Sequence, residues 1–243
     1  CRFGQGGSMR ICVFDIETGP LPKERIEAIA PAFNENKVKT GNLGLEKALA
    51  KVNEARANHF ESILDKAALR GEYGQVLACG FAEGEPEATP PIETIFDDDP
   101  NPYTSERNLL RKIWDRIKQA RESQALLVGH NSNTFDLPML LRRSFVLGVT
   151  PYREILPRNA RFFPDFCLDT LELWKMGDYD PKSRISLDRL AKAMGIEGKC
   201  GSGKFFYQLF SKDFEAAKDY LETDIRVTWE VATRLVPLTQ PNY

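Results

Sequence analysis

Residues 10–17 form a mostly apolar run that ends in two acids, Asp15 and Glu17, separated by Ile16. At the two-residue period of a strand, Asp15 and Glu17 point to the same side as Ile11 and Val13. The pattern therefore predicts a buried strand that ends in two neighbouring carboxylates.

Other apolar runs are also typical of strands. Residues 75–82 and 92–96 are joined by a loop rich in Gly, Pro and Glu, which predicts an antiparallel hairpin. Residues 125–129 are wholly apolar, as expected of a central parallel strand buried on both faces. Residues 163–168 predict a further strand, and we expect Asp169 to cap the short helix that follows it. A part in the functional site is the alternative for Asp169.

Apolar residues at helical spacing predict helices over 104–121, 186–194 and 213–236, and a helix that begins near Pro138. The same spacing predicts one long amphipathic helix over 44–70, inside an insertion at about 20–74. At 1.5 Å per residue this helix would be roughly 40 Å long. A packing arm is the favoured interpretation, and a lid that guides substrate is the alternative.

Two neighbouring acids at the end of an apolar strand repel each other. Asp15 and Glu17 therefore either share a proton or bind a cation, unless the strand end is simply solvated. Because no Cys or His stands beside the strand's acidic end, oxygen ligands favour Mg²⁺ or Mn²⁺ over Zn²⁺.

Two further acids are candidates for the same site. Asp136 ends a polar loop after the 125–129 strand, where open α/β sheets place ligand-binding residues. Capping of its own helix is the alternative. Asp224 lies four residues after Tyr220, at the border of a buried helical face, and the alternative is a solvated Asp beside a peripheral Tyr. His130 by itself is better explained as a structural residue.

Composition sets the broad class of protein. The 243 residues, with 42% hydrophobic and 28% charged side chains, are typical of one large globular domain or a domain with an insertion. No run approaches the roughly 20 apolar residues of a membrane span, and no signal peptide is recognisable, so we expect a cytoplasmic protein without membrane contact. Five Cys without C-x-x-C spacing indicate free thiols. Residues 1–8 look like an expression scar.

Net charge and short motifs do not decide the partner of this protein. A net charge of −2 argues against binding nucleic acid by bulk charge. Residues 198–205 nearly spell the phosphate-binding loop G-x-x-x-x-G-K-[ST], but Phe205 replaces the hydroxyl residue and the loop follows a helix. A basic loop that touches a polynucleotide backbone is the favoured interpretation. The acids of residues 97–99, beside Pro and Asn, predict a solvated turn.

Three segments in order resemble the motifs of a known family. Phe14-Asp15-Ile16-Glu17-Thr18 is similar to the first exonuclease motif, Asn131-x-x-x-Phe135-Asp136 to the second, and Tyr220-Leu221-Glu222-Thr223-Asp224 to the third. Together they resemble the DEDDy 3′-5′ exonucleases, which include the proofreading domain of family B DNA polymerases and stand-alone relatives. The sister DEDDh group has His five residues before the final Asp, where this chain has Asp219.

The resemblance implies a ribonuclease H-like α/β fold. Its mixed five-stranded sheet would have three antiparallel and two parallel strands, flanked by helices. Residues 9–243 would form a single exonuclease domain that carries the helical insertion at 20–74.

The resemblance also implies the site. Two divalent ions, Mg²⁺ or Mn²⁺, would lie about 3.5–4 Å apart at the scissile phosphate, one activating a water and the other stabilising the leaving 3′ oxygen. Their ligands would be Asp15, Glu17, Asp136 and Asp224. Tyr220 would orient the water. Thr18 and Asn131 would contact the terminal nucleotide, and Phe135 would do so or pack in the core.

The expected function is removal of nucleoside 5′-monophosphates from the 3′ end of single-stranded DNA. The same chemistry on RNA is the nearest alternative. RNA is distinguished from DNA by contacts with the 2′-hydroxyl group, and the motifs do not identify the residues that would make those contacts. A catalytically silent nucleic-acid-binding or docking module is the alternative from another class. A replication or repair protein is a further expected partner.

Overall fold

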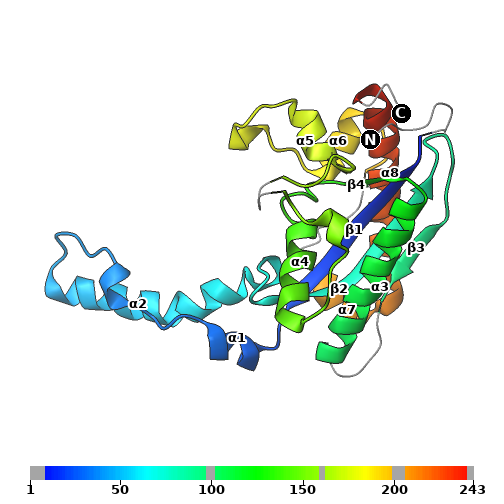
Figure 1. Ribbon diagram of the computed structural model, residues 1–243. Helices are drawn as coiled ribbons and strands as arrows, with labels where there is room; N and C mark the ends of the chain where they lie inside the picture. Colours follow the sequence, from blue (N-terminus) through cyan, green and yellow to red (C-terminus); the bar gives the residue numbers. More distant parts are fainter. Residues whose placement is uncertain (1–8, 97–101, 159–161, 199–205, 240–243) are drawn as a thin grey trace. The chain divides into compact units, whose positions relative to one another are not determined.

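The computed structural model describes residues 9–96, 102–158, 162–198 and 206–239 (Figure 1). The expression scar predicted at 1–8, the acidic turn in 97–101 and most of the basic loop, 199–205, lie outside the described residues.

The strands form one mixed sheet of five, in the order β3-β2-β1-β4-β5. β1 pairs in parallel with β4, β4 pairs in parallel with β5, and β2 pairs antiparallel with β3. The strand bounds are β1 Ile11–Pro20, β2 Gly74–Gly84, β3 Ile92–Ile95, β4 Leu126–Gly129 and β5 Cys167–Asp169. This confirms the predicted mixed five-stranded sheet of a ribonuclease H-like α/β fold. β5 covers only the end of the strand predicted at 163–168 and runs one residue beyond it.

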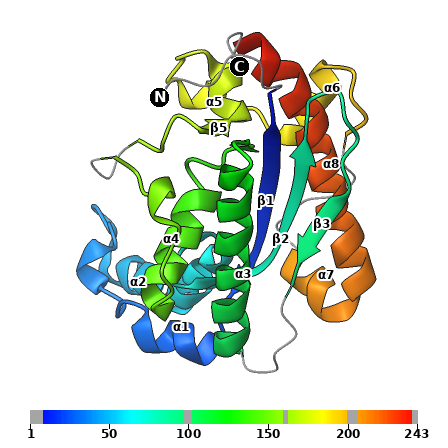
Figure 2. The same ribbon diagram turned by 45° about the vertical axis from the view of Figure 1, so that its right-hand side comes forward.

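Helices cover both faces of this sheet (Figure 2). α3 and α4 pack on one face, where they enclose Cys12, Phe14 and Ile16 of β1. α8 and α7 pack on the other face, against Ile11 and Val13. The helix bounds are α1 Lys23–Ile29, α2 Leu45–Leu64, α3 Pro102–Glu122, α4 Asp136–Leu147, α5 Thr170–Lys175, α6 Leu187–Ala193, α7 Phe206–Lys212 and α8 Phe214–Thr239.

Two glycines allow neighbouring elements to approach each other closely. A Cβ on Gly80 of β2 would come within 2.5 Å of the Ile225 Cγ1, so glycine lets α8 lie close to the sheet. A Cβ on Gly129 would come within 2.5 Å of the Ser132 Cβ, so glycine also lets the loop after β4 fold back over the strand end. Both approaches therefore depend on glycine at these positions.

The described chain divides into two compact units. One is Thr18–Gln75, called the inserted unit below, and the other is the rest of the described chain, called the sheet unit. The inserted unit has its own small core of Leu21, Ile26, Ala67 and Tyr73, with Phe60, Ile63 and Leu64 packed against it. The expectation of a single exonuclease domain over 9–243 stays a prediction.

The long amphipathic helix predicted over 44–70 is wrong at its end, and its apolar face is only partly covered. α2 stops at Leu64, so it is about 30 Å long. The Lys66 and Leu69 N–H groups then donate to the carbonyls of Ile63 and Lys66, which tightens the backbone into a 3₁₀ turn. This turn places Ala67, fully buried, in the small core. None of the twenty residues of α2 is buried.

Other helix predictions differ less. Helices α3, α6 and α8 are confirmed within three residues at each end. Ser186 caps α6 by accepting the Arg189 N–H, as the Ser start predicted. The short helices α1 and α7 were not predicted, because seven residues offer too little periodicity to recognise. Within the described ranges, no helix combines the length and apolar character that a membrane span needs.

Candidate active site

Strand alternation directs the first two acids toward α8. Ile11 and Val13 face the cluster that contains α8, and Asp15 and Glu17 continue that face by the same two-residue period. Asp15 is partly exposed, whereas Glu17 is buried. The strand therefore supplies two carboxylates from a rigid, central element of the sheet.

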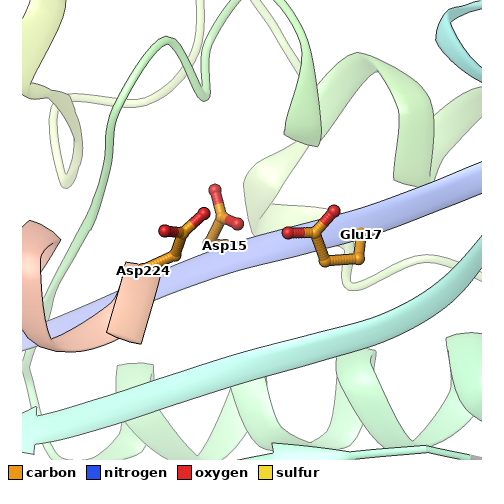
Figure 3. Close-up of side chains that lie close together, drawn as sticks. All are labelled: Asp15, Glu17 and Asp224. Carbon is orange, nitrogen blue, oxygen red and sulfur yellow. The ribbon is translucent and has the colours of Figure 1, made fainter. Parts of the chain in front are cut away.

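The third acid comes from α8. Asp224 is buried among Leu221, Ile225 and Thr228 on the helix face that packs against the sheet. One carboxylate oxygen from each of Asp15, Glu17 and Asp224 lies within 4.8 Å of the other two. Figure 3 shows the three side chains gathered beside β1, with Asp224 reaching in from the helix. Residues separated by more than 200 positions thus form one acidic cluster.

The donor set fits hard divalent cations. Three like charges this close, two of them on buried residues, repel one another strongly unless protons or a cation reduce the charge. The three ligand groups are carboxylates, with neither sulfur nor imidazole among them. Oxygen ligands of this kind suit Mg²⁺ or Mn²⁺ and disfavour a structural zinc site.

Asp136, the first residue of α4, contacts the backbone of β1. Its Oδ1 accepts a hydrogen bond of 3.1 Å from the N–H of Ile16, the residue between Asp15 and Glu17. β4 pairs with β1 only as far as Val13, so the carboxylate takes the place of a strand partner there. Phe135, not Asp136, is the N-cap residue of α4, so the capping alternative is wrong.

Burial shapes the ionisation of Asp136. Desolvation raises the pKa of its carboxyl to about 7, although hydrogen bonds from the Ile16 N–H and its own N–H act in the opposite direction. The nearby charge of Asp169 raises the pKa further. Asp136 is not one of the three residues of the tight cluster, but it is one hydrogen bond away from the backbone that joins two of them.

Asp169 makes more structural contacts than the predicted helix cap alone. It caps α5 by accepting the Leu171 N–H, which confirms the prediction. The same carboxylate accepts the N–H groups of Asn131 and Asn133, at 2.8 and 3.0 Å. Burial raises the pKa of this carboxyl, and the three N–H donors oppose that rise. Asp169 therefore fastens the loop after β4 to the start of α5.

A cleft of about 410 Å³ opens beside the acidic cluster. Asp15 and Asp224 line it together with His130, Asn131, Leu171 and the segment Arg184 to Leu187. Asn131 adopts a left-handed backbone conformation, with φ of 62°, which the Asp169 contact holds. Its side-chain oxygen accepts hydrogen bonds from Thr134 and Arg184, at 2.5 and 2.6 Å. The cleft is large enough for a small ligand or a chain end.

A family model described as a predicted 3′-5′ exonuclease related to the exonuclease domain of PolB matches residues 69–240. The match covers more than half of the chain. The chain belongs to this family of PolB-related exonucleases. The protein is thus a predicted 3′-5′ exonuclease, a hydrolase that acts on nucleic acid. The search of curated proteins found no match.

Among solved structures, the exonuclease is similar to the family B DNA polymerase from the hyperthermophilic archaeon Pyrobaculum calidifontis. The TM-score is 0.55 at 18% sequence identity, and the alignment covers 97% of this chain. At this identity the likeness shows the fold. The exonuclease spans only 26% of the length of the polymerase.

The matched family range includes Asp136, Tyr220 and Asp224, whereas Asp15 and Glu17 precede it. Tyr220 lies one helical turn before Asp224, and its ring packs at 6.0 Å from that of Phe206.

The remaining predicted substrate residues lie in different surroundings. Asn131 lines the cleft. Phe135 is partly buried against the α3–α4 core, as its packing alternative predicted. Thr18 is buried and directly follows Glu17, as the first residue of the inserted unit. Their contacts with substrate stay predictions.

Sequence reasoning missed Arg184 and the second part played by Asp169. Arg184 precedes the capping residue Ser186 by two positions, in a segment with no periodic signal. Only the fold brings it to Asn131, which is 53 residues away in the chain. A contact between residues so far apart in the chain produces no local pattern from which it could be predicted.

Proposed function

We propose that this exonuclease is a two-metal-dependent enzyme that removes nucleoside 5′-monophosphates from the 3′ end of single-stranded DNA. The observation that carries the proposal is the cluster of Asp15, Glu17 and Asp224, whose oxygens lie within 4.8 Å of one another. Two of these acids also line the 410 Å³ cleft. A cluster of carboxylates at the wall of an open cleft is the arrangement that two-metal phosphodiester hydrolysis needs.

Asp15, Glu17 and Asp224 would hold the divalent ions, with Asp136 as the fourth ligand. When bound, two such ions supply an activated water and stabilise the charge that develops on the leaving oxygen. The protein's own contribution is to hold the carboxylates on β1 and α8, so that their geometry is set before substrate arrives.

Other residues would orient the chain end. Tyr220, one turn before Asp224, would donate a hydrogen bond that orients the attacking water. The Asn131 oxygen already accepts two hydrogen bonds, and no described residue accepts from its NH₂ group, so that group can donate to the terminal nucleotide. Thr18, which directly follows Glu17, would add a further contact with that nucleotide.

A single strand suits this cleft better than a duplex end. The terminal phosphodiester must reach carboxylates that are buried or only partly exposed, so the last nucleotide must leave its stack. A frayed or unpaired 3′ end avoids much of the free-energy cost of unstacking. We therefore expect blunt duplexes to be cleaved more slowly than single strands of the same sequence.

The proposal is tested with matched DNA and RNA oligonucleotides labelled at the 5′ end. Wild-type protein is incubated with Mg²⁺, with Mn²⁺ or with chelator, beside the Asp15→Asn and Asp224→Asn variants. We expect a ladder that shortens from the 3′ end, requires metal, and is slowed at least 100-fold in both variants, the scale of loss when a key stabilising group is removed. Asp219→Asn is the matched control, because Asp219 is exposed on the same helix.

Each other result points elsewhere. A ladder with RNA and none with DNA would show that the protein is an exoribonuclease with the same site. Binding without cleavage under every metal condition would favour the catalytically silent binding or docking module. If Asp219→Asn slowed cleavage as much as Asp224→Asn does, the acidic cluster would have no specific part in catalysis.

A further inference from the structure

One wall of the cleft is a short segment, Arg184 to Leu187, that leads into α6. Asp15 and Asp224 line the same cleft. A ligand in the cleft that contacts the acids is therefore also within reach of this wall. Among the nine lining residues, Arg184 alone carries a permanent positive charge.

Two consecutive residues of the loop after β4 hold this wall. His130 Nε2 lies 3.1 Å from the Ile185 carbonyl oxygen, so Nε2 donates, and its Nδ1 lies 2.9 Å from the Thr170 hydroxyl. The next residue, Asn131, accepts the hydrogen bond from Arg184. Neighbouring side chains of one loop thus bind neighbouring residues of the other, which sets the position of Arg184 before any ligand binds.

Arg184 retains most of its capacity to bind an anion. Its side chain is exposed, and in the described part of the chain no carboxylate forms an ion pair with it. One of its five N–H donors is used by a neutral amide oxygen of Asn131. A phosphate oxygen is a stronger acceptor for guanidinium than an amide, because both partners are charged.

We propose that Arg184 binds a backbone phosphate of the substrate strand and thereby positions the chain end at the acidic cluster. The inference rests on the proposed function, since it takes the substrate to be a polynucleotide. Asn131 holds the guanidinium at the cleft wall in the free enzyme, and the phosphate replaces or joins that contact when the strand enters. Arg184 is a positioning residue that acts mainly on substrate affinity.

The test measures binding and turnover separately. Binding of a 5′-labelled oligodeoxythymidylate is measured in chelator, at several salt concentrations, for wild type and Arg184→Gln. We expect the variant to bind roughly tenfold more weakly at low salt. We also expect the slope of log Kd against log salt to fall by about 0.7, the value for one lost phosphate contact on a single strand. With metal, KM should rise while kcat changes less than about threefold.

Three further variants separate phosphate binding from loop bracing. Arg184→Lys should restore the salt slope, because it keeps the charge. Asn131→Ala should keep the wild-type slope, because Arg184 remains available to the phosphate. Lys182→Gln, an exposed lysine two residues earlier, is the matched charge control and should resemble wild type. An unchanged slope in Arg184→Gln, or the same slope loss in Lys182→Gln, would overturn the proposal.

The two proposals fail in different ways. If wild type does not cleave, the proposed function fails, while the binding assay in chelator still reports whether Arg184 contacts phosphate. If wild type cleaves and Arg184→Gln keeps its KM and salt slope, only the part assigned to Arg184 is wrong.

Discussion

The sheet unit and the inserted unit are stabilised in different ways. In the sheet unit, α8 has ten buried residues, one of which is the candidate ligand Asp224. In the inserted unit, α2 has twenty residues and none of them is buried. A helix that buries little is stabilised mainly by its own hydrogen bonds, which are marginal in water. The candidate ligand Asp224 thus lies on a helix with a large buried face. We expect the two units to unfold separately, because each has a hydrophobic core of its own.

A buried ion pair sharpens this contrast in the sheet unit. Arg143 of α4 and Glu106 of α3 are almost fully buried, and they form two hydrogen bonds of 2.8 and 2.7 Å. Glu106 also accepts the Val76 N–H at 2.9 Å, which joins β2 to both helices.

The largest expected effect is that of Arg143→Met. It leaves Glu106 buried without its cation, which should lower the free energy of unfolding by about 3–5 kcal/mol. Denaturant unfolding followed by circular dichroism measures the change. Arg142→Met is the control, since Arg142 is the exposed neighbour on the same helix. A loss below about 1 kcal/mol would show that the pair does not support the sheet unit.

A matched pair of isoleucines tests whether the units unfold separately. Ile225 of α8 and Ile26 of α1 are both fully buried. Each change to Ala should cost about 2–5 kcal/mol where the residue packs. In hydrogen exchange, Ile225→Ala should speed exchange throughout the sheet unit, whereas Ile26→Ala should do so only within 18–75. Faster exchange of α8 in Ile26→Ala would mean that the two units unfold as one.

A smaller effect is expected from the ionic network of Glu83 at the end of β2. Its carboxylate accepts hydrogen bonds from Ser123, Arg10 and Arg116. Burial raises the pKa of Glu83, but these hydrogen bonds outweigh burial and leave the pKa below its ordinary value of 4.5. The network should therefore stabilise the sheet unit above about pH 4.5 and lose its effect as the pH falls through the lowered value.

Glu83→Gln tests this pH dependence. The variant should be less stable than wild type at pH 7, and the difference should shrink below about pH 4.5. Denaturant midpoints measured at successive pH values would show the trend. A difference that stays constant with pH would mean that the charge of Glu83 does not contribute.

The smallest effect is expected on α2. Leu49 is 55% exposed, so Leu49→Ala should change stability by no more than about 0.5 kcal/mol. Leu221→Ala, at a fully buried position of α8, should cost about 2–5 kcal/mol in the same assay. A large loss of stability in Leu49→Ala would contradict the comparison of the two units, because it would mean that Leu49 is buried.

Local patterns predicted much of the fold. The strands β1, β2, β3 and β4 were recognisable as short, largely apolar runs bounded by turn residues or acids. The long helices α3 and α8 were recognisable because their apolar residues repeat at the helical period and face a core. α2 was misjudged for the same reason. Its apolar residues have helical spacing, yet only those near its C-terminal end pack against the small core, and Leu45 and Leu49 are exposed. Spacing shows that an apolar face exists, but not how much of that face is covered.

The candidate site was predictable only in part. Asp15, Glu17 and Asp224 were candidates from the sequence, and the structure brings them together. Asp136 was also a candidate, but its contact with the Ile16 N–H depends on where β4 stops pairing with β1. The contact between Arg184 and Asn131 could not be predicted, since it joins two loops without periodicity.

The sequence by itself determined the order of the elements, the alternation that sends Asp15 and Glu17 to one face of β1, and the one-turn spacing of Tyr220 and Asp224. These properties follow from bond geometry within a few residues. Only the tertiary structure decided which acids converge, that Asp169 holds the loop after β4, and that Arg184 lies at the wall of the cleft. Such contacts depend on how the elements pack across the sheet, and packing involves residues far apart in the chain.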